Sequence, residues 1–124
     1  MPVYRLTEEN FDKVLEDNSL VLVDFWAEWC TTCTSFTSVY EQIAEAYPEL
    51  LFAKVNTQIE QDISVKYRIQ SIPTLIVFHN GQEIYRKPGA MASHTLEEMI
   101  QEIKTDLLPL NLKLNRSNGN SQTG

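Results

Sequence analysis

The two cysteines of the chain, Cys30 and Cys33, are separated by two residues. They follow a largely apolar run, rich in valine and leucine, over residues 20–26. The residues after Cys33 repeat with helical period, so the pair lies where a predicted strand passes into a helix. A helix N-terminus presents unpaired N–H groups and favours an anion. In a C-x-x-C pair so placed, a thiol pKa can fall to roughly 3.5–7.5. The spacing therefore predicts thiol–disulfide exchange, with Cys30 attacking and Cys33 resolving.

Other uses of two cysteines fit the sequence less well. A structural disulfide across two residues closes a small loop and constrains the unfolded chain little. A tetrahedral zinc site needs about four ligands, and only His79 and His94 remain, without the spacing of a paired-histidine motif. No metal site within one chain is expected. A zinc or iron–sulfur site shared between two chains stays open as an alternative.

Composition and charge limit the class of partner. The chain has 124 residues, of which 43% are hydrophobic and 22% charged, as is typical of one globular domain. The net charge is −7, and residues 1–47 hold nine acidic residues against two basic ones. No basic face for nucleic acid is expected, and no apolar run reaches the ~18 residues of a membrane span. The acidic charge favours solubility and could steer basic partners to the active-site end.

The N-terminal residues and the cysteine pair indicate the cellular compartment. The N-terminal residues show no basic segment followed by an apolar stretch, so no signal peptide is expected. A dithiol without an export signal belongs in a reducing compartment, and we expect a cytoplasmic protein.

The hydrophobic pattern predicts alternating strands and helices. Strands are expected over residues 3–6, 20–27, 51–56, 74–79 and 82–86, and helices after an N-cap at Thr7, from Cys33 to Pro48, over 59–67 and over 93–108. Asn80-Gly81 favours a type I′ turn between the last two strands. The order predicts an α/β fold with a mixed central sheet, parallel in its first part and antiparallel at the hairpin.

With this order and motif the chain resembles the thioredoxins over about residues 3–108. The family pattern Val-Asp-Phe-Trp-Ala-x-Trp-Cys-Gly-Pro-Cys matches residues 23–33, with Thr31-Thr32 in place of Gly-Pro. The family's Ile-Pro-Thr segment matches residues 72–74, and its later Gly-Ala matches Gly89-Ala90. The resemblance implies the thioredoxin fold, a central mixed five-stranded sheet flanked by four helices. It also implies reduction of protein disulfides by the Cys30/Cys33 dithiol.

Asp24 and Lys54 complete the expected catalytic set. Asp24 interrupts a strand that should be buried, and a buried carboxyl has a raised pKa unless it is paired. The fold would place it behind the dithiol, where it could exchange a proton with Cys33, and Lys54 is similar to the family's lysine that meets this aspartate. Pro73 is expected after a cis peptide bond. The expected substrate-binding residues are Trp29, Thr31, Thr32, Ile72, Pro73, Gly89 and Ala90.

Cofactors and partners follow from the resemblance. No bound cofactor is expected. The substrates would be disulfide-containing proteins, and an NADPH-dependent reductase of the thioredoxin-reductase type would restore the dithiol. The protein is expected to be a monomer. Besides Thr31-Thr32, three departures set this chain apart from the family. Thr34 stands where a basic residue is usual, Ser38 stands where many members have a proline, and Asn56-Thr57-Gln58 lacks the acidic residues common there. The alternatives are a more oxidising, isomerase-like variant and a binding or assembly module without redox turnover.

The C-terminal end of the chain is more polar than the rest. The thioredoxin-like domain is expected over residues 1–110, and residues 111–124 are expected to form a disordered tail, because they are polar and lack periodicity.

Deletion of residues 113–124 should leave the melting temperature and the rate of insulin reduction unchanged. A loss of several degrees in a thermal melt would mean that Leu114 or Arg116 contributes to the folded domain.

Overall fold

The computed structural model describes residues 3–107, and the predicted tail over residues 111–124 lies outside them. The described residues form five strands and four helices. In chain order these are β1 (Val3–Arg5), α1 (Phe11–Asp17), β2 (Leu20–Trp26), α2 (Thr31–Ala46), β3 (Leu51–Asn56), α3 (Gln61–Lys66), β4 (Thr74–His79), β5 (Gln82–Pro88) and α4 (Ser93–Asp106).

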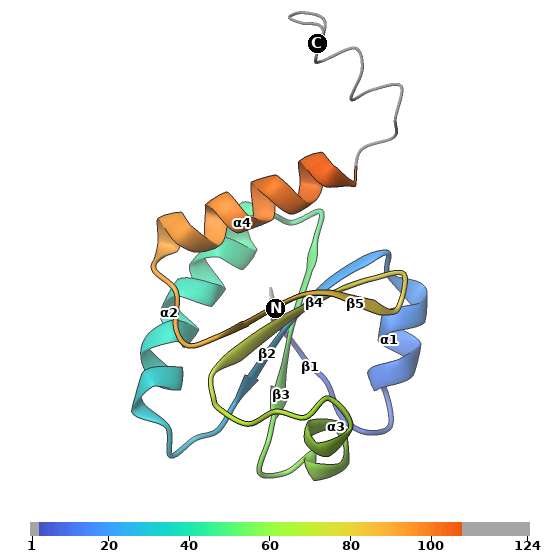
Figure 1. Cartoon of the computed structure of the whole chain (residues 1–124), viewed down its shortest axis with the longest axis vertical. Coiled ribbons are helices and arrows are strands. Elements are labelled where there is room, and N and C mark those ends of the chain that lie inside the picture. The colour runs from blue at the N-terminus through green and yellow to red at the C-terminus, as the bar shows by residue number, and fades with distance from the viewer. Residues whose placement is uncertain (1–2, 108–124) are drawn as a thin grey trace, which may run out of the picture. The chain divides into compact units, whose positions relative to one another are not determined.

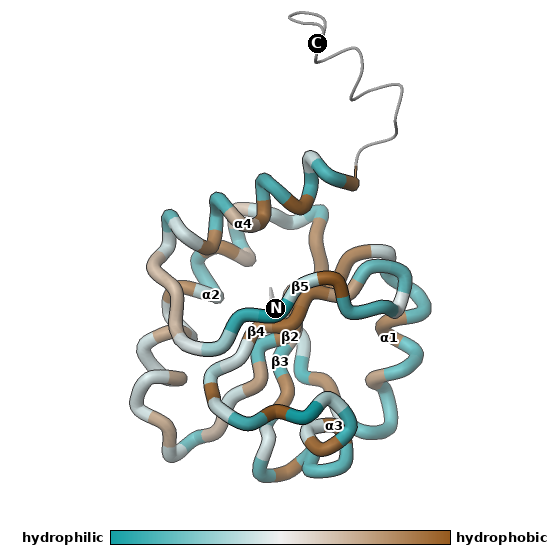
Figure 2. The backbone as a smooth tube through the Cα atoms, in the orientation of Figure 1, coloured by the Kyte–Doolittle hydropathy of each residue, from teal (hydrophilic) through white to brown (hydrophobic). Residues whose placement is uncertain are grey.

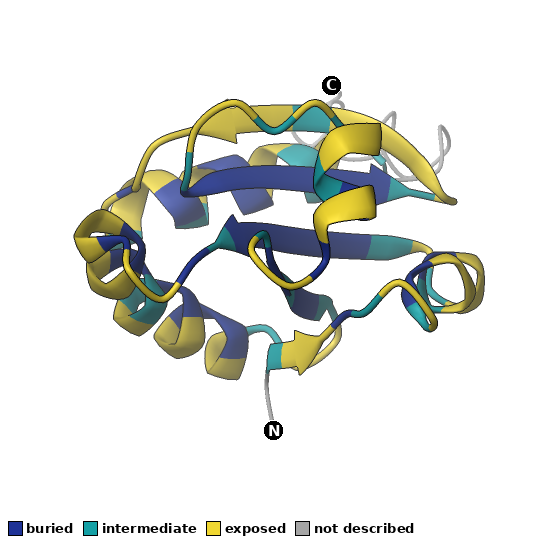
Figure 3. Cartoon of the chain, turned by 90° about the horizontal axis from the view of Figure 1, so that it is seen from below, coloured by how far each residue is buried: buried dark blue, intermediate teal, exposed yellow. Residues whose placement is uncertain are grey.

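One mixed sheet holds all five strands, in the order β1-β3-β2-β4-β5. β3 pairs in parallel with both β1 and β2, while β4 pairs antiparallel with β2 and with β5. The mixed sheet predicted from the sequence is therefore confirmed. Strand β2 is central, and in its register Asp24 is aligned with Lys54 on one side and Leu75 on the other. In Figure 3 the inner strands are almost wholly buried, whereas β5 is almost wholly exposed.

The face of the sheet that carries Leu22 packs against α2 (Figure 1). The Tyr40 hydroxyl of α2 donates to the carbonyl oxygens of Leu22 and Ala53, both at 2.9 Å. Its ring lies 5.3 Å from that of Phe52. Because side chains alternate along a strand, Asp24 points to the same face as Leu22, two residues before it. The strand therefore places this carboxyl in the layer between sheet and α2.

The opposite face is covered by α1 and α3. The Phe11 ring of α1 meets Phe78 of β4 edge-on at 5.9 Å, and Tyr67 lies 5.5 Å from Phe11. Figure 2 shows the hydrophobic residues concentrated on the inner strands, with hydrophilic residues on the outer faces of the helices. The core on this side consists of Leu6, Phe11, Leu15, Val21, Val23, Phe25, Ala53, Val55, Ile63, Ile76 and Phe78.

The chain divides into two compact units after Ala92, and α4 belongs to the second. Within α4, Leu96, Met99 and Ile100 recur at three- and four-residue steps and share one face. Among residues 3–107, no helix combines the length and the apolar character that a membrane crossing requires.

Two local details show how the sequence pattern translates into structure. Asn80 and Gly81 both have positive φ, 51° and 82°, as the predicted type I′ turn requires. The predicted N-cap at Thr7 is wrong, because α1 begins only at Phe11 with Asn10 as its N-cap. Thr7 and Asn10 instead exchange hydrogen bonds, the Thr7 N–H to the Asn10 amide oxygen at 2.7 Å and the Asn10 N–H to the Thr7 hydroxyl at 3.3 Å. The pair stabilises a separate turn before the helix.

Candidate active site

The dithiol lies at the junction between β2 and α2. β2 ends at Trp26, and Cys30 is the N-cap of α2 with an extended backbone, φ −91° and ψ 110°. The Cys33 N–H donates to the Cys30 sulfur at 3.1 Å. The two cysteines form a disulfide, with their Cα atoms 5.2 Å apart. Cys30 is 6% exposed and Cys33 is fully buried, so only Cys30 is presented toward solvent.

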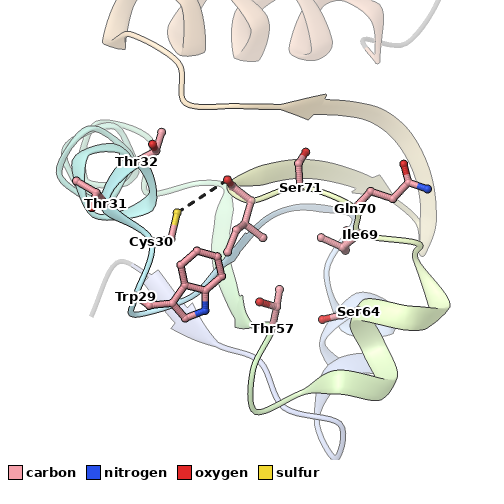
Figure 4. A pocket seen from close by; sticks show the side chains of 10 residues that line it. Trp29, Cys30, Thr31, Thr32, Thr57, Ser64, Ile69, Gln70 and Ser71 are labelled. Atoms are coloured by element: carbon pink, nitrogen blue, oxygen red, sulfur yellow. Dashed lines mark hydrogen bonds between the residues drawn. The ribbon is translucent and has the colours of Figure 1, made fainter.

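The loop before β4 closes over Cys30. The peptide bond between Ile72 and Pro73 is cis, as predicted. The Ile72 carbonyl oxygen lies 3.9 Å from the Cys30 sulfur (Figure 4). The Gly89 N–H donates to the Pro73 carbonyl oxygen at 2.7 Å, which fixes the end of β5 beside this loop. The structure thus brings Pro73 and Gly89 together.

A groove of about 630 Å³ opens beside Cys30. We refer to it as the Cys30 groove. Its lining residues are Trp29, Cys30, Thr31, Thr32, Thr57, Ser64, Ile69, Gln70, Ser71 and Ile72. Figure 4 shows the Trp29 ring standing at one side of the groove and Ile69 facing it from the other.

Asp24 is buried on the strand that leads into the dithiol. It is 2% exposed, and burial raises its pKa from 3.8 to about 7, against the opposing charge of Lys54. Its Oδ1 atom has no hydrogen-bond donor among residues 3–107. Both Asp24 and Cys33 lie in the layer between the sheet and α2. The carboxyl therefore has the burial and the pKa that proton exchange near neutral pH requires.

Lys54 is the cation aligned with Asp24 on the neighbouring strand. Its ammonium lies 5.4 Å from the centre of the Trp26 ring, within the range of a cation–π contact. In the part of the chain that the structure describes, no ion pair joins Lys54 to Asp24. Lys54 thus lowers the pKa of Asp24 by its charge from the neighbouring strand, without forming an ion pair with it.

Four predicted substrate-binding residues line the groove with Cys30, namely Trp29, Thr31, Thr32 and Ile72. Pro73, Gly89 and Ala90 lie outside its lining. Five further lining residues were not predicted from the sequence to belong to the site, namely Thr57, Ser64, Ile69, Gln70 and Ser71. Thr57 follows a strand parallel to β2, so the rule that sites gather at the carboxyl ends of parallel strands could have found it. Ser64 comes from the short helix α3 and had no such signal.

The described residues contain no cluster of three or more His, Cys, Asp or Glu side chains able to hold a metal ion.

Known proteins are similar to this chain in sequence and in fold. The family model Thioredoxin matches residues 2–102. A protein described as putative thioredoxin 2 of Streptomyces coelicolor is 42% identical over 99 residues, covering 80% of this chain and 74% of the relative. Thioredoxin of Buchnera aphidicola subsp. Schizaphis graminum is 37% identical over 102 residues, covering 81% of this chain and 94% of that protein.

Solved structures agree. Thioredoxin of Plasmodium falciparum superimposes with a TM-score of 0.75 at 32% identity, covering 80% of this chain and 97% of that one. A single-substitution mutant of a Halobacterium salinarum thioredoxin gives a TM-score of 0.77 at 29% identity, with coverage of 86% and 94%. A five-stranded mixed sheet with a Cys-x-x-Cys pair at the start of α2 defines a thiol–disulfide oxidoreductase of thioredoxin fold. The chain belongs to the thioredoxin family, whose members reduce disulfides with a redox-active cysteine pair and need no bound cofactor.

The raised pKa of Asp24 makes stability depend on pH. Well below pH 3.8 the carboxyl is neutral in both the folded and the unfolded state. Between about pH 3.8 and 7 it is ionised in the unfolded chain and still largely neutral in the folded protein, because its pKa there is about 7, so stability falls as pH rises. Asp24→Asn removes this loss. The unfolding free energy of the variant, relative to the wild type, should rise by about 4 kcal/mol between pH 4 and pH 8.

Urea denaturation at several pH values measures this difference. Asp17→Asn is the control, because this carboxylate is exposed on α1 and makes only a surface ion pair with Lys13, so its difference should vary with pH by well under about 1 kcal/mol. A flat difference for Asp24→Asn as well would contradict a buried, unpaired carboxyl.

Proposed function

We propose that Cys30 is the nucleophile of a protein-disulfide reductase and Cys33 its resolving cysteine. The observation that carries this assignment is the Cys33 N–H at 3.1 Å from the Cys30 sulfur, at the N-terminus of a 16-residue helix. A helix start stabilises a thiolate at its N-cap by hydrogen bonding and by its dipole. The fully buried Cys33 reaches the Cys30 sulfur and not a free substrate, so it resolves the mixed disulfide by attacking Cys30.

The reaction then proceeds in two exchanges. The Cys30 thiolate attacks one sulfur of the substrate disulfide, forms a mixed disulfide and releases the other substrate sulfur as a thiolate. Cys33 gives its proton to the carboxylate of Asp24 and attacks the Cys30 sulfur, which releases the second substrate thiolate. The substrate gains two electrons, and the protein ends as the Cys30–Cys33 disulfide. Lys54 favours the ionised form of Asp24, which is the proton acceptor.

Substrate contact is assigned to the residues around the sulfur. Trp29, Thr31, Thr32 and Ile72 line the Cys30 groove, and the cis Ile72–Pro73 bond presents the Ile72 backbone beside the Cys30 sulfur. Gly89 and Ala90 are exposed next to Pro73 and extend this surface.

Continued turnover needs an external reductant. We assign this role to an NADPH-dependent enzyme of the thioredoxin-reductase type, with electrons passing through the dithiol to protein disulfides. A dithiol stays reduced in the cytoplasm, where such systems maintain redox homeostasis, and we place a monomeric protein there. No nucleic-acid or membrane partner is part of the proposal.

Cysteine variants test the division of roles. With dithiothreitol as reductant, the wild type should reduce insulin, and Cys30→Ser should abolish turnover. When pre-reduced Cys33→Ser is mixed with insulin without dithiothreitol, Cys30 should attack once and then stop, since Cys33 is no longer there to resolve the mixed disulfide. Mass spectrometry should therefore find an insulin chain linked to Cys30 in this variant and none in Cys30→Ser. If Cys33→Ser reduced insulin as fast as the wild type, the resolving role would be wrong.

A further inference from the structure

The lining of the Cys30 groove carries no charged side chain. The cations of the neighbouring elements lie elsewhere: Lys54 is over the Trp26 ring, Lys66 is over the Tyr67 ring, and Arg68 is not part of the lining. The chain as a whole has a net charge of −7, and the exposed Glu28 directly precedes Trp29. A cation that enters the groove therefore meets no like charge among its lining residues.

Two hydroxyl groups lie at half-buried positions of the groove, on Thr57 and Ser64. The Thr57 hydroxyl donates to the Trp26 carbonyl oxygen at 3.1 Å, and the Ser64 hydroxyl donates to the Glu60 carbonyl oxygen at 3.1 Å. Each hydroxyl has one proton and two acceptor lone pairs. With the protons engaged inside the protein, both oxygens offer only acceptors to a bound group.

An exposed aromatic ring stands across the groove from these oxygens. Trp29 is 67% exposed, and Figure 4 places its indole on one side of the groove, with Ile69 and Ser64 on the other and Thr57 between Trp29 and Ser64. An indole face attracts ammonium and guanidinium groups more strongly than the other aromatic rings do. The aliphatic stem of a lysine or arginine fits against Ile69, while its charged end is a pure donor.

We infer that the Cys30 groove selects disulfides flanked by a basic residue, whose side chain lies on Trp29 and donates to Thr57 and Ser64. The inference rests on the proposed role of Cys30 as nucleophile, since the groove adjoins that sulfur. Thr57 and Ser64 are then specificity-determining residues that take no part in the exchange. A glutamate at the same place finds no cation and faces two acceptor oxygens.

The test uses three short peptides, each a symmetric dimer joined by one disulfide. They differ only in the residues two positions from the cysteine, which are lysine, acetyl-lysine or glutamate. The rate constant for oxidation of the pre-reduced protein is measured for each and divided by the rate constant for dithiothreitol on the same peptide, which corrects for intrinsic reactivity. Lysine should exceed acetyl-lysine by about fivefold, the order expected for a cation on an exposed indole. Glutamate should be slowest.

Charge variants locate the effect. Ser64→Lys puts a cation into the groove and should remove the lysine advantage and favour glutamate, and Gln70→Lys, at an exposed lining position, should act in the same direction. Gln82→Lys is the matched control: it changes net charge equally but lies at the far end of the sheet, paired with His79. It should leave the order of the peptides unchanged.

The outcomes separate the two proposals. Rates for the lysine and glutamate peptides within twofold of each other, or an equal effect of Gln82→Lys and Ser64→Lys, would overturn the basic-residue subsite while leaving the exchange chemistry intact. If none of the peptides oxidised the Cys30/Cys33 pair, the proposed function itself would fail.

Discussion

The contact between the Cys33 N–H and the Cys30 sulfur organises the whole site. It exists because β2 ends at Trp26 and α2 begins at Thr31, which leaves Cys30 as the N-cap. Pairing of β2 with β3 on one side and β4 on the other fixes where the strand ends. The helix start then aims its free N–H groups at one sulfur and buries the other.

The layer between the sheet and α2 also holds a buried carboxyl that lowers the stability of the fold. Asp24 is buried without a hydrogen bond to its Oδ1 atom among the described residues, and burial raises its pKa to about 7. The Tyr40 hydroxyl donates to the Leu22 and Ala53 carbonyl oxygens instead, so it gives the carboxyl no proton donor. Burial of a charge is unfavourable for folding. We interpret this cost as retained for proton exchange with Cys33, because a carboxyl with ordinary pKa would accept that proton poorly.

The sequence predicted the parts of the fold that depend on local pattern. The near-continuous apolar run of β2, the helical spacing in α2 and the Asn80-Gly81 turn each indicate one structure, and all three are confirmed. The start of α1 was misplaced because Thr7 and Asn10 are both residues that favour an N-cap, and in the structure they exchange hydrogen bonds in a turn before the helix. Local propensity does not distinguish the two positions.

Sequence patterns located the site residues that are close together in the chain. They missed the residues that are distant in the chain. Cys30, Cys33 and Asp24 lie on one strand–helix unit, so their environment follows from that unit. The groove also needs Ser64 and Gln70, which come from α3 and the loop after it. Their polar side chains look like ordinary surface residues in the sequence. Only the tertiary fold brings them to the sulfur.

Selective alkylation tests the central claim most directly. The fully reduced protein is treated at pH 7 with a small excess of iodoacetamide, and the modified residue is identified by mass spectrometry over time. The helix-start geometry predicts that Cys30 is alkylated first, and faster than free cysteine, while Cys33 stays unmodified. Equal modification of both cysteines, or Cys30 reacting no faster than free cysteine, would contradict a thiolate stabilised at the start of α2.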